Sequence, residues 1–300
     1  MAYRMNPKTP DELRCQFEAL SRALGLDPDA ANTLSVLRDP EKTSWRSIIE
    51  VIDNEKLGPY GTFRGCLDGT WLSNTPDPMT WQRTGGLARG LLEHGVRNVI
   101  IGDLSEEWYL YSIAHPITHK RDIQENLERY YPSEVVQGMI ELYGSPPDDA
   151  NVEELEKLFG VILSTAQVHL PVRLLHRDLL RAGYPTFRYT IQWTPEQARP
   201  NGEYIHSSGK ILLSRSIGYV THGTDRPLWA FRGLSAPQME VARAWLDAID
   251  RETQELAFLN SDKRDWKRVL ALQIDQQIEW TTDENWNDAT KMRKLFPGEP

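Results

Sequence analysis

The feature that most constrains the fold is a short apolar run at residues 96–102 (VRNVIIG), which follows a helical pattern and a turn. A run of this kind is typical of a strand that is buried in a parallel sheet. A second strand is expected at residues 186–193 (TFRYTIQW), where aromatic and β-branched residues alternate with others. Helical patterns lie before, between and after these strands, so the sequence predicts an α/β protein.

Acidic residues follow the first of these strands. Asp103 comes directly after the run, Glu106 and Glu107 lie just beyond it, and Asp68 would join them if the chain brought it close. Strand ends in α/β sheets present side chains into a crevice, where a carboxylate can orient an imidazole and stabilise its protonated form. Alternatively, Glu106 and Glu107 occupy the first turn of a helix, where carboxylates interact favourably with the helix dipole. Spacing alone leaves both interpretations open.

A histidine lies in a polar loop further along the chain. His222 belongs to residues 218–231 (GYVTHGTDRPLWAF) and follows a β-rich run at residues 211–221. An imidazole near a strand end suits a general base, because its unperturbed pKa is about 6.5. The alternative is a surface histidine in a turn. An acid after one strand and a histidine after a later one match the chain order of a serine-hydrolase triad, in which the serine comes first.

Other histidines indicate less. His115 and His119 are four residues apart, a spacing that places two metal ligands on one face of a helix, but Pro116 lies between them and no HExxH motif follows. His169 and His176, with Asp178 nearby, are interpreted as residues of a helix surface or of the edge of the core. Neither pair predicts a metal site, and no cofactor is expected.

Composition limits the class of protein. The 300 residues, 40% of them apolar, suffice for a sizeable core, in one large domain or two small ones. The net charge of -9 argues against a nucleic-acid or anionic-membrane partner. No run of 18 apolar residues predicts a membrane span, and the N-terminus lacks a secretory h-region. Only Cys15 and Cys66 are present, without an Asn-X-Ser/Thr acceptor, which favours a cytoplasmic chain.

The remaining elements are expected from periodicity and turn residues. Gly85 and Gly86 lack the GxGxxG spacing, so they indicate close helix packing and not an anion site. A strand fragment at residues 63–67 precedes the turn signal Asp68-Gly69. A further strand is expected at residues 269–278. Helices are expected at residues 10–26, 31–38, 43–53, 81–94, 122–159 (interrupted at 144–149), 161–181 (with Pro171 as a kink or boundary) and 234–259.

Several stretches together resemble the C-terminal half of a type-B carboxylesterase, a family of α/β-hydrolases that includes cholinesterases and fungal lipases. The resemblance covers residues 10–296 and is specific only in combination. It is carried by residues 63–76 (FRGCLDGTWLSNTP), 99–111 (VIIGDLSEEWYLY), 188–193 (RYTIQW), 218–231, 234–249 (LSAPQMEVARAWLDAI) and 283–288 (DENWND).

The resemblance implies hydrolysis of a small-molecule carboxylic ester through a serine acyl-enzyme. It places the catalytic acid on Glu107, with Glu106 matching the acid that precedes it in the family, and the catalytic base on His222. The family usually has glycine after its acid, where this chain has Trp108, so Glu106 and Asp103 stay as alternative acids.

The larger departure from the family is that no G-x-S-x-G occurs in these residues. Ser207-Ser208-Gly209 lacks both the leading glycine and the strand-to-helix setting of a serine elbow. The sequence therefore predicts an α/β-hydrolase domain without the front half of its sheet, inactive by itself, with an open sheet edge that a protein partner would cover. A non-catalytic binding protein derived from a hydrolase is the alternative.

The expected domain spans residues 1–300 as one partial unit. Its parts are the helices and Pro/Gly-rich loop of residues 1–95, the acid-bearing strand and loop of 96–119, a helical insertion at 120–182, a strand and the histidine loop at 183–233, and the terminal helix and tail of 234–300.

Overall fold

A computed structural model describes most of the chain. The loop that contains His222, the β-rich run before it and the Ser207-Ser208-Gly209 stretch lie outside the described residues. The described residues are 8–54, 57, 65–70, 72, 75–112, 115–193, 235–255 and 265–296.

The chain divides into two compact units, which are described separately. One consists mainly of Met79–Ile123 and Gly138–Pro300, and the other mainly of Met5–Pro78 and Gln124–Gln137. The second unit contains three helices that were expected from periodicity: α1 (Pro10–Ala23), α2 (Thr33–Arg38) and α3 (Trp45–Asn54).

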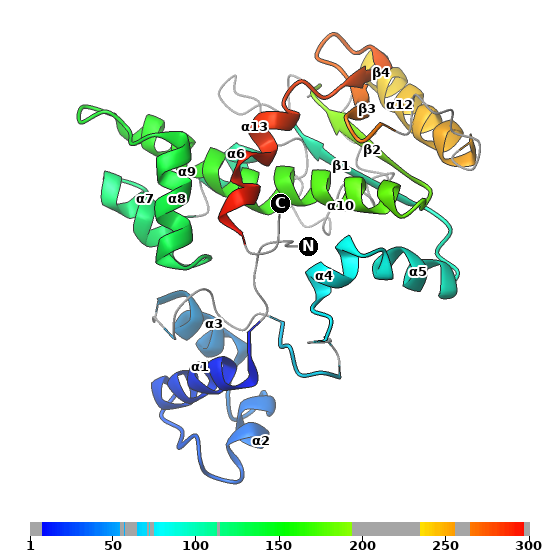
Figure 1. Cartoon of the computed structure of the whole chain (residues 1–300). Helices are drawn as coiled ribbons and strands as arrows, with labels where there is room; N and C mark the ends of the chain where they lie inside the picture. Colours follow the sequence, from blue (N-terminus) through cyan, green and yellow to red (C-terminus); the bar gives the residue numbers. More distant parts are fainter. Residues whose placement is uncertain are drawn as a thin grey trace. The chain divides into compact units, whose positions relative to one another are not determined.

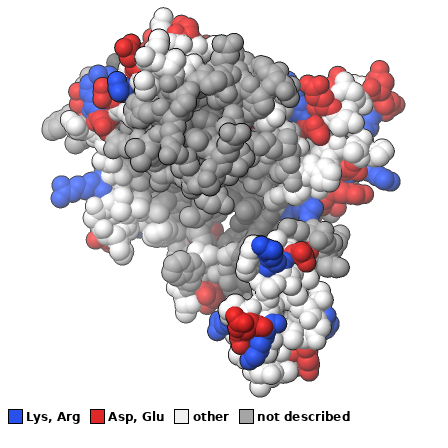
Figure 2. All heavy atoms as spheres, turned by 180° about the vertical axis from the view of Figure 1, so that it is seen from behind, with Lys and Arg blue, Asp and Glu red and all other residues white. Residues whose placement is uncertain are grey.

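Helix α1 begins where its sequence predicts, because Thr9 and Glu12 form a reciprocal capping box and Pro10 occupies the first turn. Lysine, arginine and acidic side chains alternate on this unit, with ion pairs between Arg14 or Arg22 and Glu18. Figure 2 shows the two charges intermingled over these helices, and not gathered into a patch of one sign.

The larger unit contains a mixed sheet of four strands in the order β1-β2-β3-β4. The two expected strands are β1 (Val99–Leu104) and β2 (Thr186–Ile191), which pair in parallel with Ile101 opposite Arg188. β3 (Arg268–Leu272) pairs in parallel with β2, and β4 (Ile278–Thr282) pairs antiparallel with β3. The predicted α/β class is therefore confirmed. The single strand predicted at residues 269–278 is wrong, because the chain reverses near Gln276, whose φ is 71°.

The two faces of this sheet have different chemistry. On one face, side chains of β2 and β3 form an apolar cluster with α12 (Ala236–Glu255): Phe187, Tyr189, Leu270, Leu272, Trp245 and Ile249. Successive side chains along a strand point to opposite faces, so Arg188, which lies between Phe187 and Tyr189, points to the other face, towards α10 (Leu170–Arg181). Figure 1 shows α10 and α13 (Trp286–Thr290) on one side of the strands and α12 on the other.

A long helical stretch covers the charged face of the sheet. It consists of α9 (Val152–Ser164), the π-helical segment η1 (Thr165–His169) and α10. Pro171 lies in the first turn of α10, so the expected boundary at this proline is confirmed. The stretch Val152–Arg181 is long and apolar enough to cross a membrane, but 67% of its most apolar window is buried in the protein, as in a core helix.

The helix predicted at residues 81–94 is instead two helices, α4 (Pro78–Arg83) and α5 (Gly86–Glu93). Gly85 separates the two helices because its φ of 78° is left-handed and not helical, a conformation that favours glycine. A Cβ on Gly86 would lie 2.2 Å from the ring of Trp81, so the expected close packing is confirmed. The other helices of the larger unit and of the boundary with the smaller one are α6 (Glu107–Ser112), α7 (Lys120–Leu127), α8 (Ser133–Tyr143) and the 3-10 helix η7 (Lys291–Leu295).

Candidate functional site

The candidate site begins at the carboxyl end of β1, where the predicted acids lie. Gly102 lets the ring of Tyr189 approach this strand, since a Cβ at position 102 would lie 2.4 Å from that ring. The next residue, Asp103, is 1% exposed and points towards α10. Glu107 is 2% exposed and is the first residue of α6, so its expected place in the first turn of a helix is confirmed.

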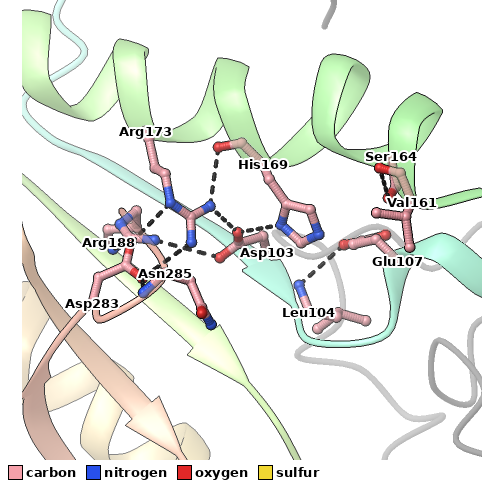
Figure 3. A network of polar contacts seen from close by, with 10 residues as sticks. All are labelled: Asp103, Leu104, Glu107, Val161, Ser164, His169, Arg173, Arg188, Asp283 and Asn285. Carbon is pink, nitrogen blue, oxygen red and sulfur yellow. Dashed lines mark hydrogen bonds and ion pairs between the residues drawn. The ribbon is translucent and has the colours of Figure 1, made fainter. Parts of the chain in front are cut away.

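Glu107 and Glu106 have different partners. A Glu107 carboxylate oxygen accepts the backbone N–H of Leu104 at 3.1 Å, which ties the acid to the end of β1 (Figure 3). The indole N–H of Trp108 donates to the carboxylate of Glu106, which is half-buried. Trp108, which stands where the resemblance would have glycine, therefore holds Glu106, one of the two alternative acids.

Helix α6 is held closely against α9 by a glycine. A Cβ on Gly160 would lie 2.3 Å from the backbone carbonyl oxygen of Trp108. Only glycine permits this approach without a shift of the backbone. The position of Glu107 therefore depends on a residue of α9 that is distant in the sequence.

Asp103 is the centre of a buried ionic network that the sequence analysis did not predict. It accepts a hydrogen bond from His169 Nδ1 at 2.7 Å and one from Arg173 Nη1 at 2.5 Å, as Figure 3 shows. Burial alone would raise the pKa of Asp103, but Arg173, His169 and Arg188 together hold that pKa well below its usual range. Asp103 is therefore ionised at neutral pH.

Asp283, which follows β4, extends the network. Arg173 donates to it through Nε at 2.8 Å, and Arg188 Nη2 lies 2.5 Å from the same carboxylate. Arg173 and Arg188 have 6% and 0% exposed side chains, so two guanidinium groups and two carboxylates neutralise each other between the sheet and α10. Such a network is costly to disrupt, because loss of one partner leaves a buried charge unpaired.

The network lines a cavity of about 600 Å³. Its walls come from the carboxyl end of β1, from alternate residues of β2 and from the start of α13 and η7. One stripe of the long helical stretch completes it: Val161, Thr165, His169 and Arg173. Ligands of α/β sheets bind at the carboxyl ends of parallel strands, which is where this cavity lies.

The predicted site residues are only partly brought together. Asp103, Glu106 and Glu107 lie at the end of one strand, whereas His222 lies outside the described residues. His119 lies in the loop before α7 and faces Asp122 at 3.6 Å, and among the described residues no group of three His, Cys, Asp or Glu could hold a metal ion. Cys15 and Cys66 are free cysteines.

The interpretation as surface or core-edge residues is wrong for His176, whereas His169, whose side chain is 18% exposed, lies at the edge of the core. His169 binds the buried Asp103, and His176 is 1% exposed within the core. A usable signal was the spacing of His169, Arg173 and Arg177 at successive turns of an otherwise apolar helix. A second signal was Arg188, a charged residue in the middle of a predicted strand.

The fold and the site thus define an α/β protein with buried carboxylates and a polar cavity at the carboxyl end of its parallel strands. No family model matches the chain. The chain is similar to a protein of Schizosaccharomyces pombe (strain 972 / ATCC 24843) named "Uncharacterized esterase/lipase C417.12", with 26% identity over 311 residues. The similarity covers 98% of this chain and 53% of that protein, so the chain spans about half the length of its relative.

Proposed function

We propose that this chain supplies the acid and the base of a serine carboxylic-ester hydrolase of the type-B carboxylesterase family. The observation that carries the proposal is the buried carboxylate of Glu107 immediately beyond the parallel strand β1. Support comes from the similarity to an esterase/lipase along 98% of the chain. The mixed sheet of four strands with helices on both faces is compatible with an α/β-hydrolase fold.

In this mechanism His222 accepts the proton of a serine hydroxyl as the serine oxygen attacks the ester carbonyl. His222 then returns the proton to the leaving alcohol. The carboxylate of Glu107 holds the imidazole in the tautomer that can accept the proton and stabilises the imidazolium that forms. The proposed substrate class is a small-molecule carboxylic ester.

The choice of Glu107 over the alternative acids rests on their partners. Asp103 is bound by His169 and Arg173, and Glu106 accepts the indole N–H of Trp108. A carboxylate committed to an arginine at 2.5 Å is poorly suited to orient a further imidazole. Glu107, which is oriented by a backbone N–H, is the acid that we assign.

The nucleophile is proposed to lie outside these 300 residues, because they contain no G-x-S-x-G. The oxyanion donors of such enzymes belong to the same part of the fold as the serine elbow. These residues by themselves should therefore have no covalent route to hydrolysis.

Turnover of p-nitrophenyl acetate tests this proposal. The wild-type chain and the His222→Ala variant should release p-nitrophenol at the same background rate. Turnover by the wild-type chain above the rate of the variant would show that these residues contain a nucleophile.

A second candidate function is a non-catalytic binding protein derived from a hydrolase. The absence of G-x-S-x-G from these residues favours it, because an acid and a histidine without a serine do not make an acyl-enzyme. The two candidates differ in their prediction for a chain that is supplied with a serine elbow. A hydrolase needs Glu107 and His222 for turnover, whereas a binding protein does not.

A further inference from the structure

The cavity beside Asp103 presents an oriented histidine. His169 Nδ1 lies 2.7 Å from the carboxylate of Asp103 and donates to it, and the tautomer with its proton on Nδ1 leaves Nε2 as a hydrogen-bond acceptor. In Figure 3 the ring extends from the end of η1 towards Asp103, with its second nitrogen turned away from that carboxylate. The side chain is 18% exposed and lines the cavity, so Nε2 is the acceptor that it offers to a ligand.

A donor and an acceptor face each other deeper in the same cavity. Arg188 Nη1 and Asp103 Oδ1 are buried, and neither has a hydrogen-bond partner among the described residues. The two atoms are 3.6 Å apart, which is too far for a direct hydrogen bond. A group that accepts from the guanidinium and donates to the carboxylate satisfies both, and a hydroxyl group does this.

The charges of the cavity select against an ionic ligand. Two carboxylates, Asp103 and Asp283, are matched by two guanidinium groups, Arg173 and Arg188. An anion would approach the carboxylates and a cation would approach the guanidiniums, so each would meet a like charge. Glu284, Asp288 and Lys291 also line the cavity, so both signs of charge recur around its walls. The walls carry hydroxyl and amide groups as well, including Thr190 and Gln192.

We propose that this cavity binds a small, uncharged molecule with several hydroxyl groups. His169 Nε2 accepts a hydrogen bond from one hydroxyl, and a second hydroxyl bridges Arg188 Nη1 and Asp103 Oδ1 from the cavity side. A cavity of about 600 Å³ is within the usual range for small-molecule sites and accommodates a molecule the size of a monosaccharide. The proposal does not rest on the ester-hydrolase assignment, since neither Glu107 nor His222 takes part.

The test is a titration of the 15N-histidine-labelled chain with glycerol, methyl glucoside, sodium acetate and tetramethylammonium chloride at constant ionic strength. The imidazole nitrogens of His169 are observed by NMR, and the 68%-exposed His119 serves as the internal reference. We expect a saturable shift of His169 Nε2 with a polyol, and none of comparable affinity with either ion. The His119 resonances should not respond.

Two variants separate binding at this site from solvent effects. Thr190→Val removes a hydroxyl from the cavity wall, and we expect it to weaken polyol binding about fivefold or more, the loss of roughly one hydrogen bond. Thr84→Val, on the exposed surface of the same unit, should bind as the wild type does. Tighter binding of acetate or tetramethylammonium, no saturable shift with any probe, or equal polyol shifts in wild type and Thr190→Val would each overturn the proposal.

Discussion

At the scale of single residues, Asp103 is the group on which the buried network depends. Replacement by Asn keeps the shape but leaves Arg173 and Arg188 with one carboxylate between them. We expect Asp103→Asn to lower the free energy of unfolding at neutral pH by about 3–5 kcal/mol, measured by urea denaturation. Asp148→Asn, which affects a fully exposed partner of Lys120, should leave the urea midpoint nearly unchanged. Equal effects of the two changes would contradict the network.

His176 gives the protein a pH dependence of its own. Burial, and then the charge of Arg188, lower the pKa of His176 from 6.5 to about 3. Because the unfolded chain binds this proton more readily, the contribution to stability is full above the unfolded pKa and is lost as the pH falls towards the folded one. The loss should reach about 2 kcal/mol at about pH 5, where the carboxylates with lowered pKa values remain ionised.

This pH dependence is measured as the urea midpoint at about pH 7 and about pH 5, with conversion through the m-value. His176→Phe should remove most of the difference between the two pH values, whereas His94→Gln, on the exposed surface, should keep it. A wild-type midpoint that does not change between the two would show that His176 titrates normally.

At the scale of elements, the contact of α6 with α9 positions the proposed acid. Gly160→Ala adds a methyl group that meets the backbone of Trp108, and we expect a loss of about 1–3 kcal/mol despite the better helix propensity of alanine. Gly138→Ala is the matched helical control, because its Cβ would meet only the tip of the Leu295 side chain, which can rotate. Equal urea midpoints for the two variants would argue against a tight α6–α9 contact.

Elements with strong local signals could be predicted from the sequence. The apolar periodicity of residues 10–26 predicted α1, and the apolar run at residues 96–102 predicted β1. The break at Gly85 and the reversal near Gln276 were missed, because a positive φ leaves no signal in the apolar periodicity. The ionic network was missed for a different reason. His169, Arg173 and Arg188 become partners only when the long helix packs on the sheet, which spacing along the chain does not reveal.

At the scale of the whole molecule, β1 lies at one end of the strand order among the described residues. Its first residues, Val99, Ile100 and Ile101, are only partly buried, although the apolar run predicts a buried strand. A strand that has no further neighbour among the described residues can pair with another chain or segment. We propose that a protein partner or a further segment covers it, and expect the isolated chain to self-associate.

Light scattering coupled to size exclusion measures this association directly. We expect a mass above that of the 34.5 kDa chain, rising with concentration. A Lys substitution on the partly exposed side, such as Val99→Lys, should reduce it, because charge on an edge strand opposes pairing. A monodisperse monomer that unfolds cooperatively would contradict the open edge.

The central claim, that Glu107 and His222 are the acid and base of an ester hydrolase, is tested most directly by complementation. The chain is mixed with the part of the Schizosaccharomyces pombe relative that it does not cover, and turnover of p-nitrophenyl acetate is followed. We predict turnover above either part alone, lowered at least about 10³-fold by Glu107→Gln or His222→Ala and retained in Glu106→Gln. No turnover in the mixture, or turnover that is indifferent to Glu107→Gln, would contradict the claim.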